Sequence, residues 1–232
     1  MTANLYTSGE YLKKNPTWHA QTSPWKAAQI LKMLERRGLA PKTICEVGCG
    51  AGEILKHLRD RMDESARFVG YEISPQAFDL CRKHESARLH FECKNILDEK
   101  DVFFDLILLM DVVEHIEDCF TFLRAIRPKS QYKILHIPLD LSVQSVLRVA
   151  PLRKIREQLG HLHHFTKETA LAVLRNMGYE IADYFYTTAT LDLPAASWKS
   201  YLARLPRRVL FALHRDFAVR LLGGCSLLVL AK

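Results

Sequence analysis

The chain has 232 residues, 48% of them hydrophobic, and a formal net charge of +7. No apolar run reaches the roughly 18 residues of a membrane span, and no internal repeat or low-complexity tract occurs, so we expect one α/β domain with extra segments. The six cysteines show no CxxC spacing and no secretory leader precedes them, which argues against a disulfide framework and predicts reduced thiols in a cytoplasmic protein.

The excess positive charge lies entirely in residues 141–232, whereas residues 1–140 are electrically balanced. A basic surface of this kind can contact nucleic acid, anionic lipid headgroups or an acidic small molecule. It can also be a solvated surface with excess arginine. The charge alone therefore leaves all four interpretations open.

Residues 1–38 are rich in aromatic side chains and are predicted to form an N-terminal helical segment. Pro24 precedes a helical pattern over residues 25–37, which ends at Gly38. We expect this helix to pack on the sheet edge, and residues 5–20 are a candidate lid. The main domain is then predicted to cover residues 39–232.

Three alternate glycines join an apolar strand pattern over residues 43–47 to a helical pattern over residues 51–61. Gly48 allows a sharp turn with positive φ, Gly50 lets a ligand lie against bare backbone, and Gly52 lets the helix start close to the strand. The helix N-terminus directs free N–H groups toward a ligand on the turn. The stretch therefore predicts a ligand site.

Two carboxylates flank this turn and indicate its ligand. Glu46 directly precedes the turn, and Glu72 ends the next strand pattern at the spacing of a ribose-binding acid. A dinucleotide fingerprint would need glycine where the chain has Glu53, and the Gly-Lys-Ser/Thr end of a phosphate-binding loop is absent. An acidic turn without a basic residue suits a cationic nucleoside such as S-adenosylmethionine (SAM).

Further polar residues follow the next predicted strands. Asn95 comes after a short strand pattern over residues 89–93, and Asp111 begins the loop after a continuous apolar strand over residues 104–110. The carboxyl ends of such strands form the edge where open α/β sheets bind ligands. In the same loop His115 titrates near neutrality and is a candidate general base, although a lone histidine is more often a structural hydrogen bonder.

Two segments interrupt the alternation of strands and helices beyond residue 140. Residues 141–164 contain two amphipathic helical patterns, and residues 194–222 include a helical pattern over 205–222 with one apolar face and several arginines. The helix over 205–222 could dock on a membrane surface or pack one face on the domain. A final strand over residues 226–231 is expected to be antiparallel.

Four stretches in register resemble the class I, Rossmann-like, SAM-dependent methyltransferases. They are Glu46–Gly52, Tyr71–Ser74, Phe104–Asp118 and Gly160–Thr166. The last is similar to the Gly-His-x-x-x-Tyr/Phe-Thr signature of the ubiquinone-biosynthesis O-methyltransferases, in the small-molecule branch. The resemblance implies an α/β fold with a doubly wound, mostly parallel seven-stranded sheet, an antiparallel last strand and helices on both faces.

The resemblance also implies roles for single residues. The glycine turn would hold the methionine portion, Glu72 the ribose, and Asn95 with Ile96 the adenine, although Asn95 could instead bond its own backbone as a turn residue. The predicted cofactor-binding residues are Glu46, Gly48, Cys49, Gly50, Gly52, Glu72, Ile73, Asn95, Ile96, Met110, Asp111 and Val112.

Two histidines are the candidate catalytic residues. His115 would contact the cofactor or the acceptor, and His161, which matches the signature histidine, or His164 would line the acceptor pocket. His163 and His164 stand close to His161 in the sequence, but no acidic or cysteine partner has metal-ligand spacing, so no metal is predicted.

The predicted activity is transfer of the SAM methyl group to a small-molecule acceptor, such as a lipid or quinone-like compound, at oxygen, with S-adenosylhomocysteine as product. The basic C-terminal half would contact a membrane or another anionic surface. An RNA or other nucleic-acid methyltransferase is less favoured, because the Asp/Asn-Pro-Pro-aromatic tetrapeptide and any Pro-Cys pair are missing. A SAM-binding protein without catalysis remains an alternative.

Overall fold

The predicted strands form one seven-stranded sheet in the computed structural model, which describes residues 9, 15, 17, 18, 20–194 and 198–232. The strand order is β3-β2-β1-β4-β5-β7-β6, and β7 runs antiparallel to both of its neighbours, whereas the remaining pairs are parallel. The predicted sheet is therefore confirmed. The strands are β1 Thr43–Val47, β2 Arg67–Tyr71, β3 Leu89–Glu92, β4 Phe104–Met110, β5 Ser130–Pro138, β6 Ile181–Thr187 and β7 Ser226–Ala231.

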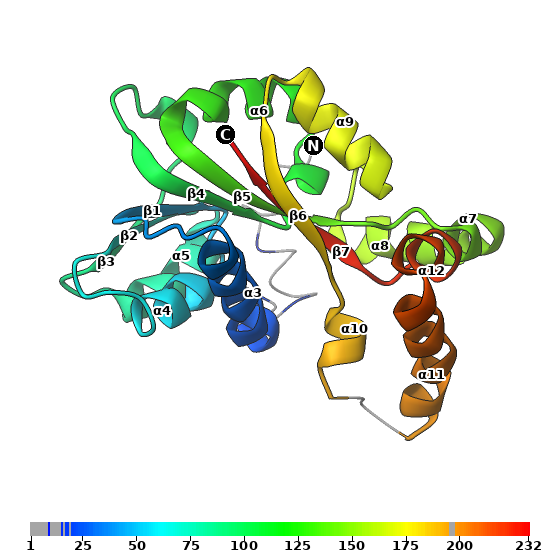
Figure 1. Cartoon of the computed structure of the whole chain (residues 1–232). Helices are drawn as coiled ribbons and strands as arrows, with labels where there is room; N and C mark the ends of the chain where they lie inside the picture. Colours follow the sequence, from blue (N-terminus) through cyan, green and yellow to red (C-terminus); the bar gives the residue numbers. More distant parts are fainter. Residues whose placement is uncertain (1–8, 10–14, 16, 19, 195–197) are drawn as a thin grey trace.

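Helices cover both faces of the sheet (Figure 1), as a doubly wound fold requires. Helices α3, α4 and α5 cover one face, and α6 and α9 cover the other. The helices are α3 Ser23–Arg36, α4 Glu53–Arg59, α5 Pro75–Cys81, α6 Cys119–Ile126, α7 Val143–Arg148, α8 Ala150–Leu159, α9 Lys167–Asn176, α10 Ala189–Asp192, α11 Trp198–Leu213 and α12 Arg215–Leu222.

The central strands are apolar throughout because both of their faces are covered. Successive side chains of a strand point to opposite faces. In β4, Ile107 and Leu109 therefore join the core under α6 and α9, whereas Leu106 and Leu108 join the core under α3 and α4. This arrangement places the carboxyl ends of the neighbouring strands β1, β4 and β5 side by side at the same end of the sheet.

Helix α3 is part of the core. Its residues Ala27, Ile30 and Met33 are fully buried against Leu55 and Leu58 of α4. Residues 25–37 therefore pack as a helix, but the expected location was wrong: α3 lies on α4 and on one face of the sheet and not on the sheet edge. Most of the candidate lid, residues 5–20, lies outside the described residues. The boundary at residue 38 stays a prediction, because α3 shares its core with the elements that follow.

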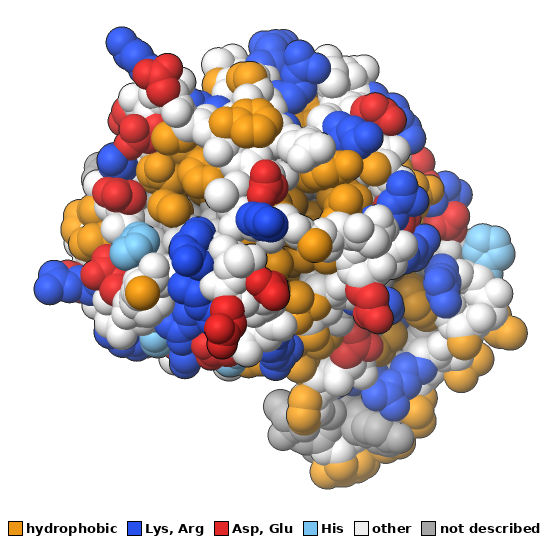
Figure 2. Space-filling view, turned by 60° about the vertical axis from the view of Figure 1, so that its left-hand side comes forward, with side chains coloured by type: hydrophobic (Ala, Val, Ile, Leu, Met, Phe, Trp, Pro, Cys, Tyr) orange, Lys and Arg blue, Asp and Glu red, His pale blue; other side chains and the backbone are white. Residues whose placement is uncertain are grey.

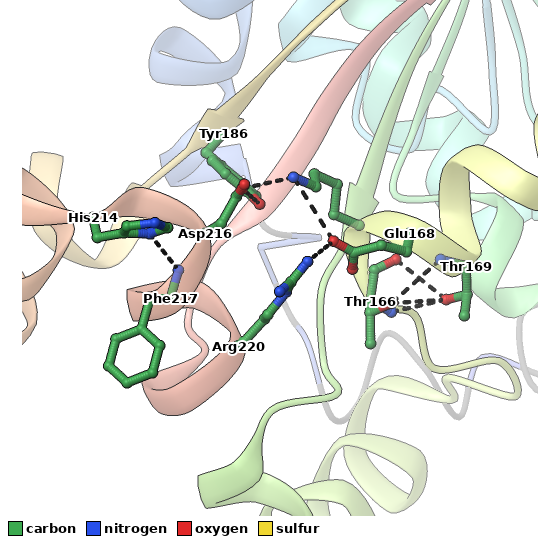
Figure 3. Close-up of polar contacts among 9 residues, drawn as sticks. Thr166, Glu168, Thr169, Tyr186, His214, Asp216, Phe217 and Arg220 are labelled. Atoms are coloured by element: carbon green, nitrogen blue, oxygen red, sulfur yellow. Dashed lines mark hydrogen bonds and ion pairs between the residues drawn. The ribbon is translucent and has the colours of Figure 1, made fainter.

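The single helix predicted over residues 205–222 is wrong: two helices, α11 and α12, meet at His214. The backbone of His214 is extended, and its Nδ1 accepts a hydrogen bond from the Phe217 N–H at 3.1 Å, which caps α12. Helix α12 is held at a new angle by Asp216, which accepts hydrogen bonds from Lys167 and Tyr186 (Figure 3). These tertiary contacts favour the break.

Two expectations from composition can be compared with the structure. None of the helices in the described part of the chain has the length and apolar character that crossing a bilayer requires. All six cysteines are free thiols, five of them buried and Cys93 exposed. The five buried thiols therefore belong to the packing of the core.

Candidate active site

A cavity of about 860 Å³ opens at the carboxyl ends of the parallel strands. It collects both candidate catalytic histidines and eleven of the twelve predicted cofactor-binding residues; Gly52 lies behind its wall. The predicted residues that line it are Glu46, Gly48, Cys49, Gly50, Glu72, Ile73, Asn95, Ile96, Met110, Asp111, Val112, His115 and His161. The fold therefore brings residues from four distant motifs into one site.

The glycine turn has the geometry that its sequence predicts. Gly48 and Gly50 have φ of +68° and +55°, and a Cβ atom at Gly50 would lie 2.5 Å from the indole of Trp18. A Cβ at Gly52 would lie 2.7 Å from the Cβ of Cys81 and from the ring of Phe91. At Gly50 the missing side chain thus makes room for the indole of Trp18 beside the cavity, whereas Gly52 allows α4 to pack closely on its neighbours.

Glu72 links the glycine turn to the end of β2. Its carboxylate oxygens accept hydrogen bonds from the N–H groups of Gly50 and Ser74, both at 2.8 Å. Burial raises the pKa of Glu72 above its ordinary value, and the backbone hydrogen bonds oppose this shift. Each oxygen keeps further acceptor capacity, so the side chain can also accept hydrogen bonds from hydroxyl groups in the cavity.

Glu46 carries a buried carboxyl oxygen, Oε2, with no hydrogen-bond partner among the described residues. Burial raises the pKa of Glu46 well above its ordinary value, and the positive charge of Lys26 opposes the shift. Buried polar atoms in folded proteins normally have a partner. The cavity is therefore built to offer an acceptor to a donor from a ligand.

Lys26 of α3 begins a polar chain across the site. Its Nζ lies 2.6 Å from Oδ2 of Asp111, whose other oxygen bonds His136. His136 in turn contacts the hydroxyl of Thr187 at 2.8 Å. Burial alone would raise the pKa of Asp111, but His136 and Lys26 hold it well below its ordinary value. This series of polar contacts connects α3 to strands β4, β5 and β6.

Asn95 supports both roles that its sequence position allowed. Its side chain accepts a hydrogen bond from the N–H of Leu97 at 3.0 Å, which is the turn role, and the residue also lines the cavity beside Ile96. Asp98, the next acidic residue in the sequence, is not among the residues that line the cavity. Asn95 therefore stays the predicted adenine-binding residue after β3.

His115 and His161 lie against each other, with ring centroids 4.8 Å apart in an edge-to-face arrangement. His161 is 5% exposed, and its Nδ1 lies 2.7 Å from Oδ2 of Asp140, which also contacts Nδ1 of His164 at 3.1 Å. Burial opposes ionisation of Asp140, but the two histidines hold its pKa below its ordinary value. The ionised carboxylate therefore orients His161.

The same arrangement makes His115 a weak base. Burial and the neighbouring His161 lower the pKa of His115 to about 4. Its imidazole is thus neutral at neutral pH, and it has little driving force to accept a proton. Of the two candidate catalytic residues, His161 has the better support, because a carboxylate fixes its orientation.

Glu114 is fully buried beside these histidines, and neither of its carboxyl oxygens has a hydrogen-bond partner within the described ranges. Burial and the nearby Asp111 raise its pKa well above its ordinary value. The ligand atoms of Glu114, His115 and His161 lie within 4.8 Å of one another, as do those of Asp140, His161 and His164. The fold thus supplies the acidic partners that sequence spacing did not reveal, and the absence of a metal stays a prediction.

A family model described as a methyltransferase domain matches residues 18–184, more than half of the chain. The chain belongs to this methyltransferase family. The resemblance found in the glycine turn and the later motifs is thereby confirmed, and the cavity lies within the matched residues almost entirely.

One curated relative is a methyltransferase as well. The ubiquinone biosynthesis O-methyltransferase of Idiomarina loihiensis is 28% identical over 87 residues, which is 35% of this chain and 35% of that protein. The matched stretch thus spans about a third of the curated relative.

Solved structures share the fold at low sequence identity. The N-methyltransferase of Bradyrhizobium japonicum in complex with S-adenosylhomocysteine has a TM-score of 0.57 at 16% identity, with 89% of this chain and 84% of that chain covered. The magnesium protoporphyrin IX methyltransferase of Synechocystis, with the same compound bound, has a TM-score of 0.57 at 17% identity over 94% and 85% of the two chains. The fold is therefore that of SAM-dependent methyltransferases.

Four residues of this methyltransferase site were missed by sequence reasoning. Trp18 lies over the glycine turn, Lys26 reaches Asp111, Asp140 orients His161, and Glu114 is buried beside the histidines. The sequence signal for Asp140 was its place directly after the fifth strand, at the same edge as Asp111. Nothing in the local pattern of α3 marks Lys26, because its partner is 85 residues away.

Proposed function

We propose that this protein binds SAM on the acid-flanked glycine turn and transfers its methyl group to a hydroxyl of a small, largely apolar acceptor. The observation that carries the proposal is that the turn and the Asp140–His161 pair open into the same cavity. A cavity of about 860 Å³ is within the usual size of ligand sites and leaves room for a small acceptor beside a nucleoside.

The residues at the turn fit the chemistry of SAM. The unpaired oxygen of Glu46 would accept a hydrogen bond from the cofactor's ammonium group, and Lys26 would attract its carboxylate. Glu72 would accept hydrogen bonds from the ribose hydroxyls, and Asn95 with Ile96 would hold the adenine. When bound, SAM supplies a methyl carbon made electrophilic by the sulfonium.

The chain's own contribution to the reaction is alignment and proton transfer. Asp140 accepts the Nδ1 proton of His161, so Nε2 of this histidine keeps its lone pair for the acceptor hydroxyl. Accepting that proton makes the oxygen a better nucleophile. The apolar wall formed by Ile116, Ile155 and Leu159 excludes water and favours an apolar acceptor.

The same proposal extends to the setting in which the protein acts. An apolar acceptor, lipid or quinone-like, is expected to reside at a membrane, and the basic C-terminal half is suited to an anionic surface. The six free thiols support the cytoplasm as the compartment, because thiols stay reduced there.

The experiment measures S-adenosylhomocysteine release with phenolic, quinol and lipid-hydroxyl acceptors. We expect His161→Asn to lower kcat at least about 100-fold on the best acceptor, because a general base contributes that much, while SAM affinity is retained. His164→Asn is the matched control, since it also contacts Asp140 but is not among the residues that line the cavity. Full turnover by His161→Asn would contradict the assigned role. If SAM binds but none of the acceptors leads to release of S-adenosylhomocysteine, a non-catalytic SAM-binding protein would be favoured.

A further inference from the structure

Helix α11 turns its apolar side chains toward the solvent. Trp198, Leu202, Leu205, Val209 and Leu213 recur at intervals of three and four residues, so they form one stripe along the helix. Their exposed fractions lie between 38% and 78%. A helix that merely covers the domain would bury such a stripe, and we call these five residues the α11 stripe.

The arginines of α11 fix the helix in this orientation. Arg204 donates to the carbonyl of Leu193 at 2.8 Å, and Arg208 donates to the carbonyl of Leu191 at 2.9 Å. Arg207 donates to the carbonyls of Leu222 and Gly223. The face that carries these arginines and Phe211 therefore meets the domain, whereas the α11 stripe points away from it.

The apolar surface continues on two neighbouring helices. Phe217 of α12 is exposed, and on α7 the side chains of Val143, Val146 and Leu147 are exposed as well, Leu147 by 79%. Helices α7, α11 and α12 lie together on one side of the molecule (Figure 1). Hydrophobic side chains also gather along the lower edge of the molecule, at the height of α10 and α11 (Figure 2).

Basic side chains accompany this surface. Arg148 ends α7, and Arg153, Lys154 and Arg156 lie exposed on α8, which follows it. Arg215 is exposed at the start of α12. An apolar stripe accompanied by cations is the pattern of helices that lie in the interface of an anionic bilayer, where apolar side chains enter the acyl boundary and cations contact headgroups.

We propose that the α11 stripe, extended by the exposed apolar residues of α7 and α12, docks the protein on an anionic lipid bilayer. The elements that carry this surface also border the cavity, since Ile155 and Leu159 of α8 and Ala189 of α10 line it. Docking would therefore place the entrance for the acceptor next to the membrane. In this respect the inference rests on the proposed function, but the binding itself does not depend on catalysis.

Sedimentation of the full chain with lipid vesicles tests the proposal. Vesicles of phosphatidylcholine and phosphatidylglycerol in equal parts should bind the protein, and vesicles of phosphatidylcholine alone should bind it more weakly. The double variant Val209→Glu with Leu213→Glu should lower the affinity at least about tenfold, because two anchors are lost and two negative charges are added. Both positions are exposed, so folding should be unaffected.

Phe103→Glu is the matched control, since Phe103 is 64% exposed but directly precedes β4, at the amino end of the parallel strands and thus at the opposite end from the cavity. It should bind vesicles as the wild type does, and all three proteins should keep the same SAM affinity and melting temperature. Failure of the wild type to bind anionic vesicles, or equal binding by the double variant, would overturn the proposal. The proposal would also be overturned if the wild type forms a dimer, does not bind vesicles, and becomes monomeric in the double variant. The α11 stripe would then be the interface with a second copy of the chain.

Discussion

In the proposed reaction, Asp140 orients the histidine that acts on the acceptor. Its Oδ2 accepts hydrogen bonds from Nδ1 of His161 and Nδ1 of His164, so Nδ1 of His161 carries a proton, and His161 is one of the residues that line the cavity. His115 lies in contact with His161 but has a pKa of about 4. The residue that the sequence marks most clearly, His115 in the loop after β4, is therefore a weak base.

The buried neutral state of His115 has a measurable effect on stability. Its pKa is about 4 in the folded protein, against about 6.5 when unfolded. The unfolded chain therefore binds the proton more strongly, and the contribution of His115 is fully present above pH 6.5 and is lost as the pH falls toward 4. Relative to His115→Gln, the wild type should lose about 2 kcal/mol of unfolding free energy between pH 7 and pH 5.

Urea denaturation of both proteins at the two pH values measures this difference. Subtracting the unfolding free energy of His115→Gln from that of the wild type removes the contribution of buried carboxyls such as Glu46 and Glu114. Their raised pKa values change stability with pH in the opposite direction. A stability difference that does not change with pH would show that His115 is not a buried neutral imidazole.

At the scale of elements, the turn between β1 and α4 depends on close packing behind the cavity. Gly52 has φ of +74°, and a Cβ there would lie 2.7 Å from Cys81 and Phe91. We expect Gly52→Ala to lower the unfolding free energy by about 3 kcal/mol, because the clash adds to the backbone strain. Gly38→Ala is the control: its φ is +60° but nothing lies within 4 Å, so about 1 kcal/mol is expected. Chemical denaturation compares the two, and equal losses would exclude the clash.

The elements themselves show where sequence patterns are sufficient. The apolar run of β4 lies as predicted, because local periodicity determines it. The break at His214 was not predicted. The break depends on contacts of α12 with α9 and β6, such as the ion pair between Arg220 and Glu168 (Figure 3). The helical pattern over residues 205–222 contains no information about these contacts.

At the scale of the whole molecule, the sheet and the acid-flanked turn were predictable, since Glu46 and Glu72 stand at strand ends and strand ends converge in an open α/β sheet. Lys26, Glu114 and Asp140 were not assigned, because their importance arises from burial and from partners brought together by the fold. The orientation of the α11 stripe was equally hidden, because an amphipathic pattern does not say which face meets the domain.

The central claim is that a bare backbone turn between two buried carboxyls binds SAM, and titration calorimetry tests it most directly. Glu46→Gln keeps the shape of the side chain but removes the oxygen acceptor that has no partner in the described structure. Loss of a hydrogen bond to a charged group costs about 1.5–3 kcal/mol, so the variant should bind SAM at least about tenfold more weakly than the wild type at unchanged melting temperature. Absence of SAM binding by the wild type, or equal affinity in the two proteins, would contradict the account.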